Sequence, residues 1–203
     1  MKVIWFSNCS LCGRMSSGSG SWLHAMKQIL SGYVTIINIT EGRVKEVHRS
    51  NEDNFEEYIL PEYKLKNGIP GEDEICVIQR IISTVNPDII HIWGLEKYWG
   101  LLYARGFIKG TVIVEIQGLL SGCASACYAG MTEKEIKETY GIKELVKPNT
   151  SMKNLYQYYI RSSMFESEIL RASNFLSTQS EWVRDMIKFT PPYKDLCMKQ
   201  LCL

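Results

Sequence analysis

The sequence predicts a doubly wound α/β domain with a mostly parallel, Rossmann-like sheet. Two runs, at 88–93 and 111–117, are apolar at almost every position, which is typical of strands buried on both faces. Around them apolar residues recur at helical spacing, most clearly over 72–85. Apolar strands that alternate with amphipathic helices favour a parallel sheet covered by helices on both sides.

The remaining elements follow from the same patterns. A strand over 3–7 is followed by a Ser, Cys and Gly loop, and Gly32 stands where a helix over 20–31 would end. Asn86-Pro87 stops the helix over 72–85. The other predicted strands cover 33–39 and 174–177, with candidate strands at 44–47 and 58–60 as a hairpin or an edge, and the other predicted helices cover 95–106, 132–140, 151–172 and a segment from about 180.

Composition narrows the class of protein. The 203 residues include 23 Lys and Arg against 22 Asp and Glu, so no basic excess suggests a nucleic-acid partner. Seven cysteines, an odd count, occur without a secretory signal peptide, so we expect reduced thiols and a cytoplasmic protein. No apolar stretch approaches the ~18 residues of a membrane span, so we expect contact with the inner membrane face to be peripheral at most.

The functional residues are expected just after the strands, because ligands of such sheets bind outside the carboxyl ends of the strands. This rule selects the loop over 8–21, His91 and Trp93 with Glu96, the Gln117-Gly118 corner, and 178–181 with Glu181. Each has a structural alternative. His91 is equally a satisfied core residue, Gln117 a tether for its loop, and Glu96 a carboxylate in the first turn of a helix.

The segment Gly18-Ser19-Gly20-Ser21 opens the first helix and is a candidate phosphate cradle. Glycines allow backbone N–H groups to approach an anion closely, and the helix N-terminus adds its dipole. The alternative is a flexible Ser/Gly loop. A dinucleotide fingerprint that ends at Glu41 matches poorly, because Leu23 stands where the third glycine belongs.

Cysteines suggest two further chemistries. Cys9-x-x-Cys12 after the first strand resembles a redox pair, and with Cys123 and Cys127 it offers four thiolates for zinc. The second spacing is wrong for a zinc knuckle, so we interpret these residues as free thiols and expect no metal. The aromatic stripe of the 151–172 helix is interpreted as core or interdomain packing, and its charged residues as a solvated face.

Several segments, in their order, resemble glycosyltransferase family 4, whose members have the two-domain GT-B architecture. The segments are KVIWFSN, GSGSWL, NPDIIHIWGLE, VIVEIQGLLSG and EILRASNFLST with the following QSEW, and they span residues 2 to about 188. The resemblance implies a retaining enzyme that moves a sugar from a nucleotide-sugar donor to a glycan or lipid-linked acceptor, without cofactor or metal.

The resemblance also implies roles for residues. Gly18, Ser19, Gly20 and Ser21 would face the donor diphosphate, while His91, Trp93, Glu96 and Gln117, with Gly118 and Glu181, would line the acceptor side. Many relatives carry His in the position of Gln117, and Gln cannot donate a charged proton. His91 and Gln117 are the catalytic candidates, and we predict that they open onto one cleft.

Length sets this chain apart from the family. We expect residues 1–190 to form the acceptor-side N-terminal domain and 191–203 to be a truncated tail or the start of an interdomain linker, with the donor-binding domain absent. The lone chain should then be inactive and prone to self-association through its uncovered face. The alternatives are a non-catalytic α/β module that binds a phosphorylated ligand or a partner protein, and a thiol redox protein.

Overall fold

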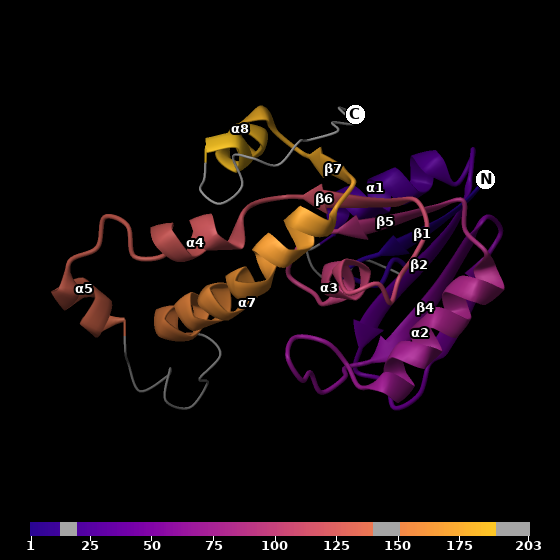
Figure 1. The fold of residues 1–203 in the computed structure, drawn as a ribbon, viewed down its shortest axis with the longest axis horizontal. Helices are drawn as coiled ribbons and strands as arrows, with labels where there is room; N and C mark the ends of the chain where they lie inside the picture. Colours follow the sequence, from indigo (N-terminus) through magenta and orange to yellow (C-terminus); the bar gives the residue numbers. More distant parts are fainter. Residues whose placement is uncertain (13–19, 140–150, 190–203) are drawn as a thin grey trace.

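A computed structural model describes residues 1–12, 20–139 and 151–189 and shows one seven-stranded, mostly parallel sheet, as predicted (Figure 1). The strands are β1 (Lys2–Phe6), β2 (Thr35–Gly42), β3 (His48–Glu52), β4 (Phe55–Pro61), β5 (Ile89–Trp93), β6 (Val112–Ile116) and β7 (Phe175–Thr178). The helices are α1 (Ser21–Leu30), α2 (Glu72–Val85), α3 (Trp99–Ala104), α4 (Leu120–Ala126), α5 (Glu133–Glu138), α7 (Met152–Ala172) and α8 (Glu181–Phe189).

The strand order is β3-β4-β2-β1-β5-β6-β7, and every neighbouring pair is parallel except the β3–β4 hairpin. The predicted hairpin at the edge is therefore confirmed, but the expected strand over 44–47 is wrong. The first strand of the hairpin is His48–Glu52, a polar and mostly exposed segment. Backbone pairing to β4, from His48↔Ile59 to Glu52↔Phe55, forms this strand without burial, so no apolar pattern marks it.

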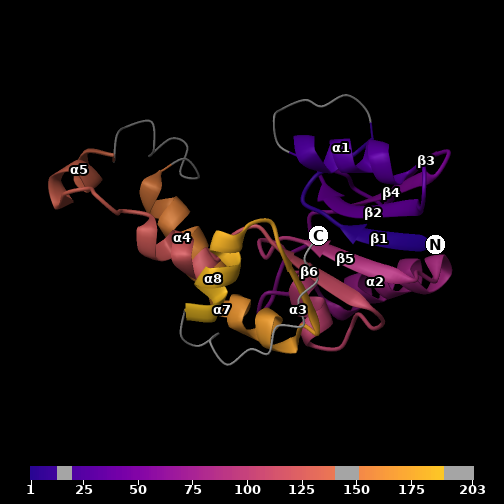
Figure 2. The ribbon, with the colours of Figure 1, turned by 90° about the horizontal axis from the view of Figure 1, so that it is seen from above.

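The sheet is covered by helices on both faces. In Figure 2, α1 lies on one side of the strands, whereas α2, α3 and α7 lie on the other. On the α1 side Leu23 packs with Trp5 and Trp93 in a small core. The larger core on the opposite side includes Ile78 of α2, Leu102 of α3 and Ile169 of α7. From β1 the sheet is first built outward through β2 and β4 and then, on the other side of β1, through β5, β6 and β7. Right-handed crossovers that build the sheet in opposite directions place their helices on opposite faces, which gives this two-sided arrangement.

The helix predicted over 95–106 begins only at Trp99. Gly94 ends β5 with φ +88°, and a Cβ there would meet Glu96 Oε2 at 2.0 Å, so the chain turns sharply and Glu96 folds back over the glycine. Residues 95–98 therefore form a loop at the carboxyl edge of the sheet. Glu96 is consequently not a first-turn carboxylate of a helix.

One helix, α4, has no counterpart in the prediction. Its sequence, LSGCASA, contains a glycine and two serines and lacks an amphipathic pattern. A buried carboxylate of α7 holds its first turn, because Glu166 accepts hydrogen bonds from Leu120 N and from Ser121 Oγ, both at 2.5 Å. Together α4 and α7 extend beyond the sheet, with α5 at their far end (Figure 1).

Candidate functional site

A groove opens where the chain leaves the carboxyl ends of β4 and β5. It has two adjoining hollows, of about 380 and 190 Å³, which share Leu65, Glu96, Lys97 and Tyr98 as lining residues. The loops after β4 and β5 form two of its walls, and α7 forms the third through Tyr158, Arg161 and Phe165. This is the edge at which parallel α/β sheets bind their ligands.

An ion pair joins the end of β2 to the loop after β5 at this groove. Lys97 Nζ lies 2.8 Å from Glu41 Oε2, and the side chain of Glu41 is only 5 % exposed. Glu41 Oε1 also accepts a hydrogen bond from the backbone N–H of Tyr63 at 3.4 Å. The end of β2 is thereby fixed to the loops after β4 and β5, and the one ammonium group among the described residues that line the larger hollow is neutralised.

Tyr98 lies where the two hollows meet. Its side chain is almost fully buried, and its hydroxyl has no hydrogen-bond partner of normal geometry. Burial, followed by the nearby Glu41 carboxylate, strongly raises the pKa of Tyr98. A buried hydroxyl without a partner carries a cost on the order of 1–3 kcal/mol, which a ligand group at this position would offset.

The loop after β1 reaches the same groove. Asn8 Nδ2 donates to Glu96 Oε2 at 3.2 Å, and Trp99 Nε1 donates to the carbonyl of Ser7 at 3.3 Å. The loops after β1 and β5 therefore lie together at this edge, and the end of β2, which was not predicted to take part, joins them through Glu41.

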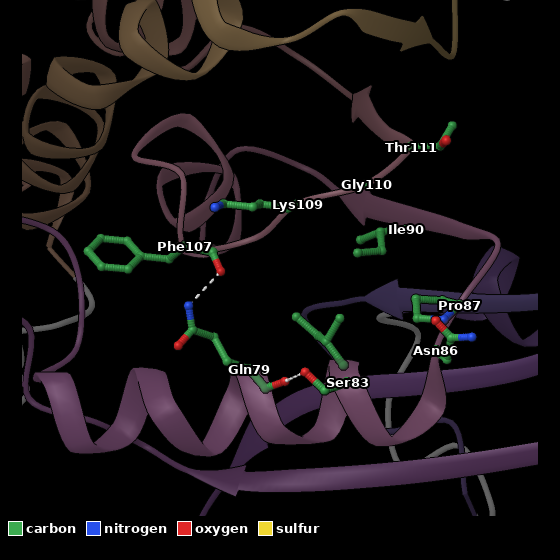
Figure 3. A pocket seen from close by; sticks show the side chains of 10 residues that line it. Gln79, Ser83, Asn86, Pro87, Ile90, Phe107, Lys109, Gly110 and Thr111 are labelled. Carbon is green, nitrogen blue, oxygen red and sulfur yellow. Dashed lines mark hydrogen bonds between the residues drawn. The ribbon is translucent and has the colours of Figure 1, made fainter.

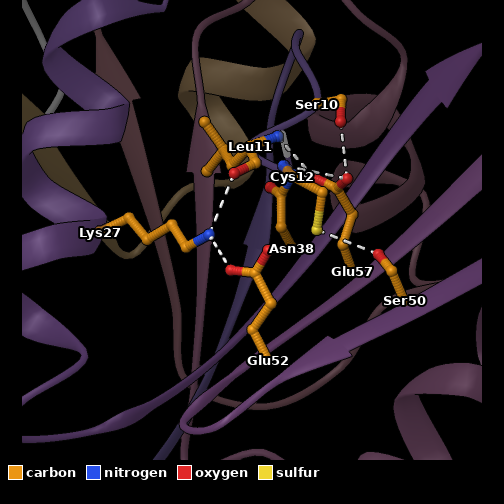
Figure 4. A network of polar contacts seen from close by, with 8 residues as sticks. All are labelled: Ser10, Leu11, Cys12, Lys27, Asn38, Ser50, Glu52 and Glu57. Atoms are coloured by element: carbon orange, nitrogen blue, oxygen red, sulfur yellow. Dashed lines mark hydrogen bonds and ion pairs between the residues drawn. The ribbon is translucent and has the colours of Figure 1, made fainter. Parts of the chain in front are cut away.

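Residues 10–12 of the first loop are anchored by Glu57 of β4, which is fully buried (Figure 4). Its carboxylate accepts from Ser10 Oγ and Leu11 N, both at 2.6 Å, from Asn38 Nδ2 at 2.8 Å and from Cys12 N at 3.4 Å. Both amide hydrogens of Asn38 are used, the second by the carbonyl of Cys9, and its Oδ1 has no partner. No charge pattern in the sequence indicated this anchor.

The glycine segment is described only in part, because Gly18 and Ser19 lie outside the described residues. Gly20 is the N-cap of α1 with φ +79°, and a Cβ there would lie 2.5 Å from Cys9 Sγ. Glycine at position 20 is thus required by the fold itself. Ser21 begins α1, and the role of this segment toward a diphosphate stays a prediction.

His91 and Gln117 come from neighbouring strands. His91 is 8 % exposed, stacks on Trp93 with ring centroids 3.7 Å apart, and places Nε2 3.7 Å from Glu115 Oε2. Neither His91 Nε2 nor Trp93 Nε1 has a hydrogen-bond partner. Gln117, just beyond β6, is half-buried.

None of these residues lines the two hollows of the groove. Of the expected acceptor residues, only Glu96 does. Gly118 is half-buried, and Glu181 is exposed at the start of α8, where Arg184 Nη2 lies 3.4 Å from its Oε1. A common cleft for His91 and Gln117 stays a prediction.

The described cysteines of the two motifs lack the environment of an activated thiol. Cys9, Cys12, Cys123 and Cys127 are free thiols, and burial raises the pKa of Cys9, Cys12 and Cys123. Glu57 raises the pKa of Cys9 and Cys12 further, whereas reactive thiols need a lowered pKa. Within the described parts of the chain, no three His, Cys, Asp or Glu side chains lie together in a way that would hold a metal ion.

A separate hollow of about 540 Å³ lies at the opposite, amino-terminal edge of the sheet (Figure 3). It lies between α2 and the segment before β6, and Gln79 Nε2 spans it to the carbonyl of Phe107 at 2.9 Å. Ser83, Lys109 and Thr111 at its rim are exposed. Its place at the amino ends of β5 and β6 sets it apart from the convergent loops.

Most groove residues were not predicted as functional. Lys97 and Tyr98 were placed inside a helix, while Phe165 and Arg161 were interpreted as packing and as a solvated face. The rule that selected Glu96 would have selected its two neighbours, had the turn at Gly94 been recognised from the sequence.

No family model matches the sequence, and no curated protein matches it. The fold is similar to that of sucrose-phosphate synthase from Thermosynechococcus elongatus, with a TM-score of 0.61 at 10 % identity over 99 % of this chain and 47 % of that chain. The chain therefore spans about half the length of that structure. This likeness shows the fold alone: the chain resembles one Rossmann-like half of that structure.

Two other structures have lower scores. An E. coli structure named trehalose-6-phosphate, bound with UDP-2-fluoro glucose, has a TM-score of 0.40 at 10 % identity, over 91 % of this chain and 41 % of that chain. An α,α-trehalose-phosphate synthase (UDP-forming) from Burkholderia vietnamiensis has 0.38 at 9 % identity, with the same coverage. Neither score supports an argument of its own. No helix in the described residues is long and apolar enough to cross a membrane.

Proposed function

We propose that this chain is the N-terminal, acceptor-side half of a retaining family 4 glycosyltransferase. The complete enzyme moves a sugar from a nucleotide-sugar donor to a glycan or lipid-linked acceptor. The observation that carries the proposal is the fold: nearly the whole chain superposes on about half of sucrose-phosphate synthase, an enzyme whose name states the synthesis of a sugar phosphate. The groove at the carboxyl edge supports an acceptor role for this half.

The geometry favours binding over complete catalysis. The groove offers carboxylates, tyrosines and an apolar wall, which suit a sugar acceptor. Transfer further requires the reacting atoms at about 3–3.5 Å with the developing charge stabilised. We assign those contacts to a second domain that holds the nucleotide, so the 203-residue chain should not transfer sugar by itself.

The test compares the 203-residue chain with a version extended through a second domain. Donor binding is measured by calorimetry, and transfer and donor hydrolysis by product release. The short chain should bind nucleotide sugar on the order of millimolar, about −4 kcal/mol, and only the extended version should turn over. Micromolar donor binding or turnover by the short chain contradicts the half-enzyme proposal. Activity in neither version favours the non-catalytic module.

A further inference from the structure

The two hollows of the groove differ in chemistry. We call the larger one the acidic arm, because its lining includes Glu41, Glu62 and Glu96, and the smaller one the apolar arm, because its lining includes Leu65, Leu101 and Phe165. The arms meet at Tyr98. We propose that the groove takes an amphipathic glycoside, with an uncharged or amino sugar ring in the acidic arm and an apolar aglycone in the apolar arm. The binding of this glycoside is inferred from the groove itself, and only its role as the acceptor of the transferred sugar rests on the proposed function.

The acidic arm carries an excess of negative charge. Its one lining cation, Lys97, is bound to Glu41 at 2.8 Å, which leaves the carboxylates of Glu62 and Glu96. Carboxylates in and beside the arm also act on its tyrosines: after burial, Glu74 and Glu41 raise the pKa of Tyr63, and Glu96 raises that of Tyr158. Carboxylates accept hydrogen bonds from sugar hydroxyl or ammonium groups, whereas a phosphate or uronate here would be repelled.

The hydroxyl of Tyr98, close to the Glu41 carboxylate, is a second feature that points to a ligand. The side chain is 3 % exposed and lines both arms, and its buried oxygen, just beneath their junction, makes no hydrogen bond of normal geometry. Buried hydroxyl groups are ordinarily hydrogen-bonded, so this oxygen is the expected partner of a ligand hydroxyl or glycosidic oxygen at the junction of the arms.

The apolar arm gives a reason for the exposure of the Leu65 side chain. Leu65 is 47 % exposed on the rim, facing a wall that includes Phe165, Leu101 and Ile169. Arg161 also lines this arm from α7 and is exposed. An alkyl or aryl group attached to the sugar would cover Leu65 and gain the free energy of apolar burial.

The experiment measures binding to the 203-residue chain by NMR titration. The probes are methyl and hexyl glycosides of glucose, galactose and mannose, together with glucosamine and glucose 6-phosphate. At least one hexyl glycoside should bind about tenfold more tightly than its methyl counterpart, as burial of two methylene groups gives. Glucose 6-phosphate, which is negatively charged, should bind more weakly than each neutral glycoside or amino sugar for which binding is detected.

Two variants with matched controls locate the ligand. Leu65→Ser should remove most of the hexyl advantage, whereas Ile29→Ser, at an apolar residue of α1 that is 65 % exposed on the opposite face, should not change it. Glu62→Gln should raise affinity for glucose 6-phosphate about threefold to fivefold, as removal of one surface charge gives. Glu133→Gln, at an exposed residue of the distant α5, should leave that affinity unchanged.

Several outcomes overturn the inference. These are no binding by any glycoside of the panel, equal binding of hexyl and methyl glycosides, tightest binding by glucose 6-phosphate through Arg161, or equal effects of Leu65→Ser and Ile29→Ser. Sugar transfer by the extended version together with any of these results would leave the proposed function standing. Selective binding of hexyl glycosides without sugar transfer by the extended version would support the inference and contradict the proposed function.

Discussion

Two buried polar regions meet the carboxyl edge of this sheet, and they differ in how their hydrogen bonds are satisfied. At Glu57, three donors within 2.8 Å and a fourth at 3.4 Å surround one carboxylate, and all come from the protein. At Tyr98, a hydroxyl that is equally removed from water lies near the Glu41 carboxylate but makes no hydrogen bond of normal geometry. The first arrangement holds a loop in one conformation, whereas the second leaves an unmet hydrogen bond beside an open groove. Substitutions in the two regions should therefore have opposite effects on stability.

The largest effect is expected at Glu57. Glu57→Ala leaves Ser10 Oγ, Leu11 N and Asn38 Nδ2 buried without their acceptor, so the free energy of unfolding should fall by about 3–5 kcal/mol. Glu57→Gln keeps the shape but turns an amide toward donors, and should cost about 1–2 kcal/mol. Urea unfolding followed by circular dichroism measures both values.

The neighbouring Glu56 gives the control for Glu57. Its carboxylate pairs with the exposed Arg49, so Glu56→Ala should cost less than about 1 kcal/mol. If Glu57→Ala and Glu56→Ala destabilise the chain equally, Glu57 does not anchor the first loop.

A smaller effect is expected at Gly20, where the first loop joins α1. Gly20→Ala combines a left-handed backbone, at about 1–2 kcal/mol, with the contact to Cys9 Sγ. Gly106 has nearly the same φ, +77°, but open space around a Cβ, so Gly106→Ala isolates the backbone cost. Thermal unfolding should show the larger loss for Gly20→Ala, and Cys9→Ala in the same chain should remove most of the difference. An equal loss at both glycines would show that Cys9 does not restrict position 20.

The sequence predicted elements whose stability comes from apolar periodicity. The helix at 72–85 has the predicted bounds, and the strands at 88–93 and 111–117 agree within one or two residues. It failed where tertiary contacts form the element: β3 depends on pairing with β4, and α4 depends on Glu166. Local propensity does not contain these contacts.

The same distinction explains the site. Glu96 follows a strand and was predicted from that position alone. Lys97 and Tyr98 face the groove only because Gly94 turns the chain with φ +88°, and Phe165 reaches it from a helix more than sixty residues later in the chain. The ion pair between Lys97 and Glu41 likewise joins residues 56 positions apart. Long-range proximity of this kind follows from the topology of the sheet, which the sequence gives only in outline.

The smallest change in stability, and the one of opposite sign, is expected for Tyr98→Phe. The substitution removes a buried hydroxyl that has no partner while keeping the ring against Trp99, whose centroid lies 4.3 Å away. Because no hydrogen bond of normal geometry is lost and the nearby Glu41 carboxylate keeps its ion pair with Lys97, the chain should be unchanged or more stable, by up to about 1 kcal/mol in urea unfolding. Tyr58→Phe is the control, since its hydroxyl lies near Arg49 and Glu56 at the β3–β4 edge and not at the groove.

A loss of about 1 kcal/mol or more with Tyr98→Phe would mean that the hydroxyl is satisfied within the protein, and the contrast with Glu57 would disappear. Unchanged or increased stability together with weaker glycoside binding would assign the hydroxyl to the ligand.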